Sequence, residues 1–298
     1  MTEEITNVNP AIVKALADLK TAVQSCKDKD DEQAKTAEKK IDDKDGFCRS
    51  PEVKKFKEAA TKIVDDMWAQ YNALKENYES GLRTHENVAT NLHKVYNDTW
   101  QQMDKAVEPI LTDIENRQQQ THWKGPGAEE YMKQLPAQYA AVQEFRQYIQ
   151  VAGSGVETPA LLQHGVFLGF QSLLTSRKEA ISGYAETDPG EHYYQRCDWA
   201  RAALKQANDW VKDTMMTGKE YWKPPLDDHV RQMTSTKVTS PEVLKGDKWP
   251  NAAKGDTSGL KPPTAPKYTA PGGASGLPSA PGTERGDGKG LQTSDYGA

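Results

Sequence analysis

One long periodic stretch of apolar residues most constrains how this chain can fold. From residue 53 to residue 82, apolar side chains recur at spacings of three and four: Val53, Phe56, Ala60, Ile63, Met67, Tyr71, Leu74, Tyr78 and Leu82. The pattern continues more loosely through Val88, Leu92, Val95, Met103 and Val107. These spacings keep one helix face apolar, so they predict a long helix in a coiled-coil-like bundle. Gly81 and Pro109 are the expected kinks, since each weakens the backbone hydrogen bonds of a helix.

Further helices are expected on both sides of this seam. Asn9-Pro10 is a typical helix start. The charge run at 27–45 has fourteen charged side chains of alternating sign among its nineteen residues, which fits a solvated helix or a hairpin tip. The stripe from Tyr131 to Ile149 predicts another helix, which Gly153-Ser154-Gly155 should end. A new helix should open at Thr158-Pro159.

The last predicted helix follows a turn at Asp188-Pro189-Gly190 and runs from about Glu191 to Trp222. No stretch predicts a strand. The chain is 36% apolar and 27% charged, which suits a bundle with much solvated surface better than a compact α/β enzyme. We therefore expect an all-α fold, an elongated antiparallel helical bundle with long helices over residues 1–236.

The composition changes from Lys237 onward. Residues 237–298 hold eight of the 17 prolines and eleven of the 22 glycines, with few large apolar side chains. Such a segment buries too little surface to offset the entropy lost on ordering. It is predicted to be a Pro/Gly-rich disordered tail.

Charge and hydropathy exclude several classes of function. The net charge of −5 is small, so nucleic acid is not an expected partner. The first ten residues carry no apolar run, which argues against a Sec signal peptide. The apolar stretch from Ala160 to Leu174 is too short to span a bilayer, and nothing in the sequence supports a membrane or lipid contact.

The motifs of common enzymes are missing. Gly218-Lys219 and Gly288-Lys289 are followed by Glu220 and Gly290, whereas a phosphate-binding loop requires Ser or Thr there. None of the six histidines follows a Glu-x-x-His pattern, so no metal site is predicted. We expect a protein that is not an enzyme and that needs no cofactor.

The chain has three cysteines, too few for a disulfide scaffold. Cys26 and Cys48 flank residues 27–47, and in a helical hairpin they would meet and form a disulfide under oxidising conditions. The alternative is three isolated thiols.

A compact corner lies between two strongly helical stretches, in the run Trp123-Lys124-Gly125-Pro126-Gly127-Ala128. Trp123 can fill the gap between two antiparallel helices. Gly125 can take backbone angles that a side chain forbids. Pro126 suits the first turn of the next helix, where its missing N–H has no helical partner. The sequence thus predicts a turn at 123–125 that joins two helices.

This corner, with Ala128 and Tyr131 after it, has the pattern Trp-x-Gly-x-x-Ala-x-x-aromatic. The pattern resembles the WXG-type helical hairpins exported by type VII (ESX) secretion. Longer relatives, the PPE and EspB-like substrates, place a similar corner in an elongated bundle and often add a Pro/Gly-rich tail. The resemblance covers residues 87–188 best, and the whole architecture loosely.

The same families carry a Tyr-x-x-x-Asp/Glu export signal near a helix end. Two matches exist, Tyr184 with Asp188 and Tyr194 with Asp198. The resemblance favours Tyr184 and Asp188, which should lie at a helix C-terminus downstream of the corner. In EspB-like proteins the export tyrosine precedes the corner, whereas here it follows.

The resemblance implies a secreted or cell-surface protein, cytoplasmic before export, that acts through protein contacts. Its implied partners are a type VII secretion ATPase and a secretion chaperone or further copies in a homo-oligomer. The corner with Trp123 and Gly125 would be recognised by the ATPase or by a second subunit. One alternative is an intracellular coiled-coil scaffold that self-associates through the same seam. Another is the targeting half of a toxin, although no folded catalytic domain is expected in the tail.

Overall fold

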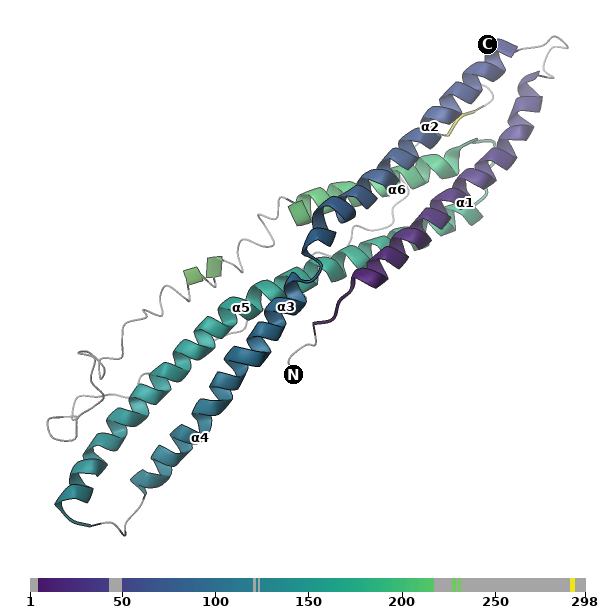
Figure 1. Ribbon diagram of the computed structural model, residues 1–298. Coiled ribbons are helices and arrows are strands. Elements are labelled where there is room, and N and C mark those ends of the chain that lie inside the picture. The colour runs from purple at the N-terminus through teal and green to yellow at the C-terminus, as the bar shows by residue number, and fades with distance from the viewer. Residues whose placement is uncertain are drawn as a thin grey trace. The chain divides into compact units, whose positions relative to one another are not determined.

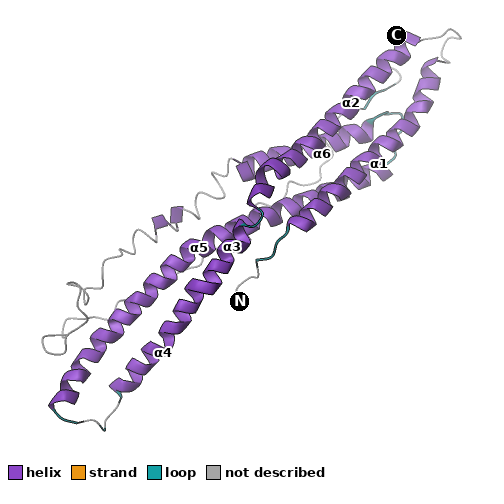
Figure 2. Cartoon of the chain, in the orientation of Figure 1, coloured by secondary structure: helices purple, strands orange, loops and turns teal. Residues whose placement is uncertain are grey.

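The computed structural model describes residues 5–42, 50–119, 122, 124–216, 227–228, 230–231 and 290–292. Helices account for most of these residues, and no strand is present among them (Figure 2). The all-α fold with long helices is therefore confirmed. Most of the tail expected at 237–298, together with Trp123 and Cys48, lies outside the described residues.

Six long or medium-length α-helices, α1 to α6, follow one another within the described segments (Figure 1). They are α1 (Asn9–Asp42), α2 (Ser50–Glu76), α3 (Val88–Val95), α4 (Gln101–Gln118), α5 (Pro126–Glu186) and α6 (Gln195–Trp210). Short π-helical or 3-10 segments accompany them: η2 (Asn77–Gly81), η3 (Leu82–His85), η4 (Tyr96–Trp100) and η5 (Val211–Met216).

The bundle expected over residues 1–236 is divided into two compact units. The first, here called the hairpin unit, contains the described residues within 5, 88–163, 227–228 and 230–231. In it, α3, η4 and α4 pack against the first part of α5. The second, the bundle unit, contains the described residues within 6–87 and 164–216, together with 290–292. Helix α5 begins in the hairpin unit and ends in the bundle unit.

The bundle unit is an antiparallel four-helix bundle of α1, α2, the end of α5 and α6 (Figure 1). All four helices contribute fully buried side chains to one core, among them Leu19, Leu74, Phe170 and Leu204. The predicted seam from residue 53 to residue 82 lies in this unit. Its residues are all buried or half-buried, as expected for a helix face that packs on three neighbours.

One interpretation of the charge run at 27–45 is a solvated helix, and the structure shows that this helix is not fully solvated. Helix α1 continues through it to Asp42, and Asp30, Ala34, Ala37 and Ile41 are buried. These residues recur at spacings of three and four, so they form a narrow inward face among charged neighbours. The high charge density concealed this face in the sequence.

The predicted interruption at Gly81 is confirmed. Gly81 has φ −103° and ψ −83°, and the chain passes from the π-helical turn η2 into the 3-10 turn η3 at this point. Helix α4, in contrast, continues through Pro109.

The continuation of the seam into the hairpin unit is only partly correct. Val107 is buried, but Val88, Val95 and Met103 are exposed. A π-helical turn accommodates one additional residue, which rotates the following side chains by about 100° around the helix axis. Because η2 and η4 both interrupt the helical stretch, a spacing of three and four in the sequence no longer selects a single face.

The expected helix end at Gly153-Ser154-Gly155 and the new start at Thr158-Pro159 are wrong. Helix α5 runs without a break through all of these residues. A Cβ built on Gly153 would lie 2.9 Å from Trp100 Cβ and 3.2 Å from Tyr96 Cε2. Gly153 therefore allows η4 to approach α5 closely, and its role is packing rather than helix termination.

Candidate recognition site

The corner predicted at 123–125 joins two helices, as the sequence indicated. Helix α4 ends at Gln118 and α5 begins at Pro126. Gly125 has φ +117°, in the region that favours glycine, and its carbonyl accepts the amide N–H of Glu129 at 3.0 Å. Two predictions are thereby confirmed: the unusual backbone at Gly125, and Pro126 as the first residue of the helix.

The described part of the corner is accessible to a partner. Lys124, Pro126 and Gly127 are exposed and Gly125 is half-exposed, whereas Ala128 is buried. No atom lies within 4 Å of a Cβ built on Gly125, so the backbone angle alone selects glycine there.

A hydrogen bond ties the two helices together beside the corner. The guanidinium of Arg117, in the last turn of α4, donates to the Tyr131 hydroxyl at 3.2 Å. Arg117 also forms an ion pair with Asp113 at 2.8 Å, which orients it along α4. The aromatic residue of the Trp-x-Gly-x-x-Ala-x-x-aromatic pattern thus links α5 to α4.

Tyr184 and Asp188 lie at the C-terminal end of α5, the position the sequence predicted, but in different environments. Tyr184 is in the last turn of α5, is 5% exposed and packs its ring on Trp199, with 5.7 Å between ring centroids. Asp188 is exposed in the loop beyond the helix, where its Oδ1 accepts the Gly190 N–H at 2.9 Å. Within the folded bundle unit, a partner can touch the carboxylate but not the tyrosine ring.

The second match, Tyr194 with Asp198, is less accessible than Asp188 of the first. Tyr194 precedes α6 with φ +57°, and its hydroxyl donates to Asp31 Oδ1 at 3.0 Å. Burial, assisted by Asp31, raises the pKa of this hydroxyl. Asp198 is buried and forms an ion pair with Arg201. Neither Tyr194 nor Asp198 is as accessible as Asp188.

Asp30 was not predicted as a site residue, yet it fixes the start of α6. Its Oδ2 accepts the Cys197 amide N–H at 2.9 Å, and its Oδ1 accepts Arg196 Nη1 at 3.0 Å. Tyr194 at the N-cap of α6 provides no side-chain cap, so the carboxylate from α1 takes that part. Complete burial raises the pKa of Asp30, and the two hydrogen bonds oppose that rise.

Arg196 extends this anchor to the loop after α5. Its Nε donates to the Thr187 carbonyl at 3.0 Å, and its Nη1 also donates to Gln33 Oε1 at 2.8 Å. One guanidinium therefore holds α1, the start of α6 and the segment between Tyr184 and Asp188. Only the spatial arrangement reveals this, because Asp30 and Arg196 are far apart in the sequence.

The cysteines of the described chain are free thiols. Cys26 is fully buried in the bundle unit, and its Sγ donates to the Ile181 carbonyl at 3.4 Å. Burial raises the pKa of the Cys26 thiol to about 12, and burial likewise raises the pKa of Cys197. Because Cys48 lies outside the described residues, the disulfide between Cys26 and Cys48 stays a prediction.

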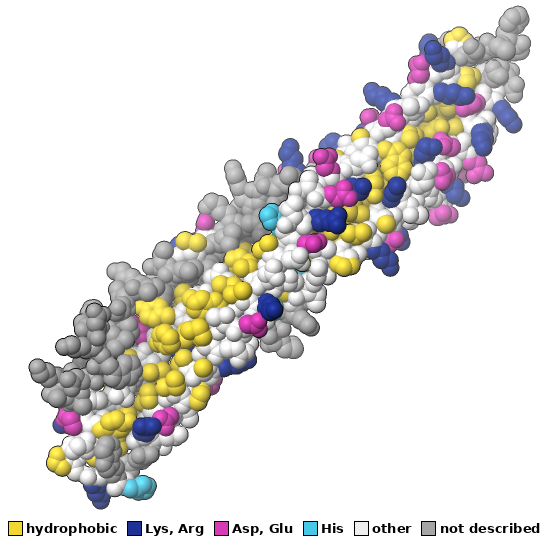
Figure 3. Space-filling model, viewed as in Figure 1, with side chains coloured by type: hydrophobic (Ala, Val, Ile, Leu, Met, Phe, Trp, Pro, Cys, Tyr) yellow, Lys and Arg dark blue, Asp and Glu magenta, His cyan; other side chains and the backbone are white. Residues whose placement is uncertain are grey.

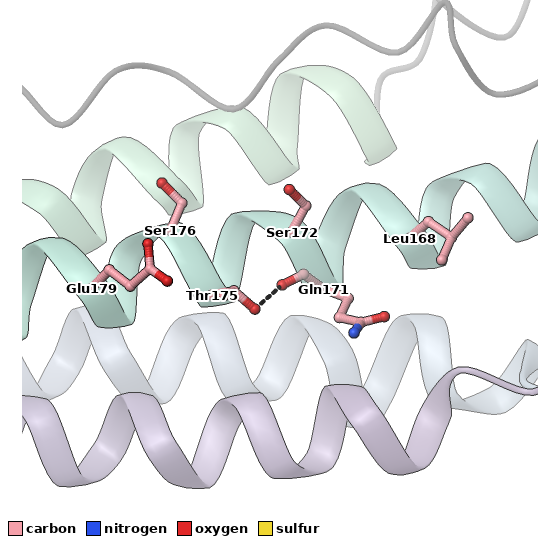
Figure 4. A pocket seen from close by; sticks show the side chains of 6 residues that line it. All are labelled: Leu168, Gln171, Ser172, Thr175, Ser176 and Glu179. Carbon is pink, nitrogen blue, oxygen red and sulfur yellow. Dashed lines mark hydrogen bonds between the residues drawn. The ribbon is translucent and has the colours of Figure 1, made fainter.

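A shallow groove of the bundle unit offers little for catalysis (Figure 4). It is lined along α5 by Leu168, Gln171, Ser172, Thr175, Ser176 and Glu179. The Thr175 hydroxyl donates to the Gln171 carbonyl of its own helix at 3.0 Å. All six lining residues come from one helix, so the groove does not bring catalytic groups of two elements together.

No group of three or more His, Cys, Asp and Glu side chains among the described residues is arranged to hold a metal ion. No helix of the described segments has the length and apolarity needed to cross a membrane.

Comparisons with protein-family models, curated proteins and solved structures gave no match to this chain.

Proposed function

We propose that this protein is a non-enzymatic substrate of a type VII-like secretion system that acts through protein contacts. The corner between α4 and α5 carries the proposal. Gly125 holds a positive φ in an exposed turn, and Pro126 opens a long helix behind it. A Trp-x-Gly turn between two antiparallel helices is the setting in which WXG-type hairpins carry their motif.

In this proposal the export signal consists of the corner, with Trp123 and Gly125, and of Tyr184 with Asp188. Asp188 is the part that the secretion ATPase contacts directly, since it is exposed while Tyr184 is buried. The Tyr184 ring positions the end of α5 through its packing on Trp199.

A charge-specific variant tests the signal without disturbing the fold. Asp188→Asn keeps an oxygen that can accept the Gly190 N–H but removes the negative charge. We expect export into the culture medium to fall at least tenfold, with an unchanged melting temperature. Glu186→Gln, at an exposed acidic residue two positions earlier, is the matched control and should be exported normally. Normal export of Asp188→Asn would show that the secretion ATPase does not recognise this carboxylate.

Two further variants test the corner and the second tyrosine motif. Trp123→Ala should abolish export while the protein stays folded. Tyr194→Phe removes the hydroxyl bound to Asp31 and tests the second motif. If Tyr194→Phe blocks export and Asp188→Asn does not, Tyr194 and Asp198 form the signal.

A self-associating scaffold is the second candidate, and one observation favours it. Apolar side chains lie in a row along the face of the hairpin unit seen in Figure 3 (yellow, lower left). The large exposed apolar residues described in this unit are Val88, Val95, Met103, Ile110, Phe145 and Val230. Exposed apolar patches on helices commonly mark protein contacts. Under the secretion proposal a chaperone or further copies of this chain cover them, whereas a scaffold requires further copies.

Sedimentation of the purified full chain separates these two candidates. The oligomeric state of the wild-type chain is compared directly with that of Ile110→Asp. A scaffold predicts an oligomer that Ile110→Asp dissociates. A monomeric wild-type chain argues against the scaffold.

A further inference from the structure

The loop between α5 and α6 presents a short extended backbone that pairs with the C-terminal segment of the chain. The Tyr193 N–H donates to the Leu291 carbonyl at 2.8 Å, and the Leu291 N–H donates to the Tyr193 carbonyl at 2.9 Å. The two residues thus form an antiparallel bridge within the bundle unit. This is the geometry by which an extended peptide adds to an exposed backbone edge.

The position before the bridge accepts glycine only. Gly290 is buried, and its N–H donates to the Gln195 side-chain oxygen. A Cβ built on Gly290 would lie 2.6 Å from Gln195 Oε1, 2.9 Å from Gln195 Cβ and 3.0 Å from the Tyr193 carbonyl oxygen. Gln195 is itself buried in the first turn of α6, and the Tyr193 oxygen belongs to the backbone, so neither can move aside easily.

The side chain of Leu291, the bridge residue, packs against an apolar cluster. Leu291 packs on a cluster whose buried members are Ala34, Ala37, Ile41, Phe56 and Tyr193. The Phe56 and Tyr193 rings meet edge to face, with 6.0 Å between centroids. Helices α1 and α2 and the loop therefore form this apolar cluster together, which favours a large apolar side chain after the glycine.

The third position is held by a polar contact at the surface. The Gln292 side-chain nitrogen lies 3.1 Å from Nδ1 of the His192 ring. Gln292 is exposed, so this contact orients the peptide but excludes few other side chains. Three different features thus constrain three successive residues: a steric limit at Gly290, the apolar cluster around Leu291 and a surface hydrogen bond at Gln292.

We propose that this loop is a peptide-docking site for an extended glycine–large apolar–polar sequence, and that the chain's own Gly290-Leu291-Gln292 occupies it as an intramolecular latch. The latch seals the apolar cluster between α1 and α2 and fixes the loop that runs from Asp188 to Tyr194. Its contacts are few and it closes a long loop, so a peptide of the same pattern should displace it. The inference is independent of the proposed export.

Amide hydrogen exchange on the full chain tests the latch directly. In Gly290→Val, exchange at the Tyr193 amide should become at least tenfold faster, because its acceptor at Leu291 is withdrawn. Gly288→Val changes a neighbouring glycine of the same segment and is the control, with exchange at Tyr193 expected to match the wild type. Unchanged exchange in Gly290→Val, or equal acceleration in both variants, would overturn the proposal.

Binding in trans tests the specificity of the site. A fluorescent synthetic peptide covering residues 287–294 should bind full-length Gly290→Val at least tenfold more tightly than it binds the wild-type chain, whose site is filled. The same peptide with valine in place of Gly290 should not bind. Equal affinity for the two proteins, or binding of the valine peptide, would show that this loop does not read the sequence.

Discussion

Replacement of Gly153 by alanine should destabilise the hairpin unit, although alanine is the better helix former. The new Cβ would lie 2.9 Å from Trp100 Cβ, which is attached directly to the backbone of η4 and cannot rotate away. The neighbouring Tyr96 ring atom, at 3.2 Å, leaves no room on the other side. Helix α5 and η4 would therefore have to separate locally, and overpacking of this kind costs about 1–3 kcal/mol.

Alanine has an opposing effect, because it favours the helix over glycine by about 1 kcal/mol. Taking the middle of the packing range, we expect Gly153→Ala to lower the free energy of unfolding by about 1 kcal/mol net. Gly183→Ala provides the matched control on the same helix, since no atom lies within 4 Å of a Cβ built there. This control should gain up to about 1 kcal/mol from helix propensity alone.

Urea denaturation of the two full-length variants, followed by far-UV circular dichroism, measures both effects. The difference between the variants isolates the packing penalty at Gly153, and we expect it to be about 2 kcal/mol. If Gly153→Ala is as stable as Gly183→Ala, α5 and η4 are not in close contact and the packing explanation for the unbroken helix is wrong.

Three further predictions follow from individual contacts. Gly125→Ala should destabilise by about 1–2 kcal/mol because of its φ of +117°, whereas an equal or higher melting temperature would contradict that backbone conformation. Arg146 donates to Asp104 at 2.8 Å and lowers the pKa of this carboxyl, so the stabilisation is present above the unfolded pKa of about 3.9 and is lost as pH falls through the folded pKa. Asp104→Asn should therefore be less stable than the wild type by about 0.5–1 kcal/mol at neutral pH and equally stable in strong acid, as unfolding curves at both pH values will show. Because burial raises the pKa of Cys26 and of Cys197, both should react with a thiol reagent at neutral pH only after unfolding, and rapid labelling of either in the native protein would contradict their burial.

The parts of the fold that depend on local sequence were predictable. The apolar spacing from residue 53 to residue 82 located a buried helix face, because the period of an α-helix is fixed. Gly125 and Pro126 marked the start of α5 because each restricts the backbone in a characteristic way. These features need no knowledge of distant residues.

The errors arose where one residue type serves two physical purposes. The flexibility of glycine predicts a helix end at Gly153, but here Gly153 lets another helix approach closely. Pro159 predicts a helix start, but α5 continues through it. From the sequence alone, a glycine that breaks a helix and one that packs against a tryptophan look the same.

The site residues that were missed depend on contacts between distant segments. Asp30 lies in a charged stretch, and only the folded bundle places Arg196 and the Cys197 amide beside it. The pairing of Leu291 with Tyr193 is equally non-local, and a Pro/Gly-rich composition gives no sign of one short docked sequence. Gly290 is the residue whose identity the site requires, but it is one of many glycines in that region.

The measurement that tests the proposed function most directly is the location of the protein in the cells that encode it. Culture supernatant and cytoplasm are compared between the wild-type strain and a strain that lacks the type VII secretion ATPase, with a cytoplasmic enzyme as the control for lysis. The proposal predicts the protein in the wild-type supernatant and its retention in the cytoplasm of the ATPase mutant. Equal amounts in the two supernatants, or a protein that stays in the cytoplasm of both strains, would contradict it.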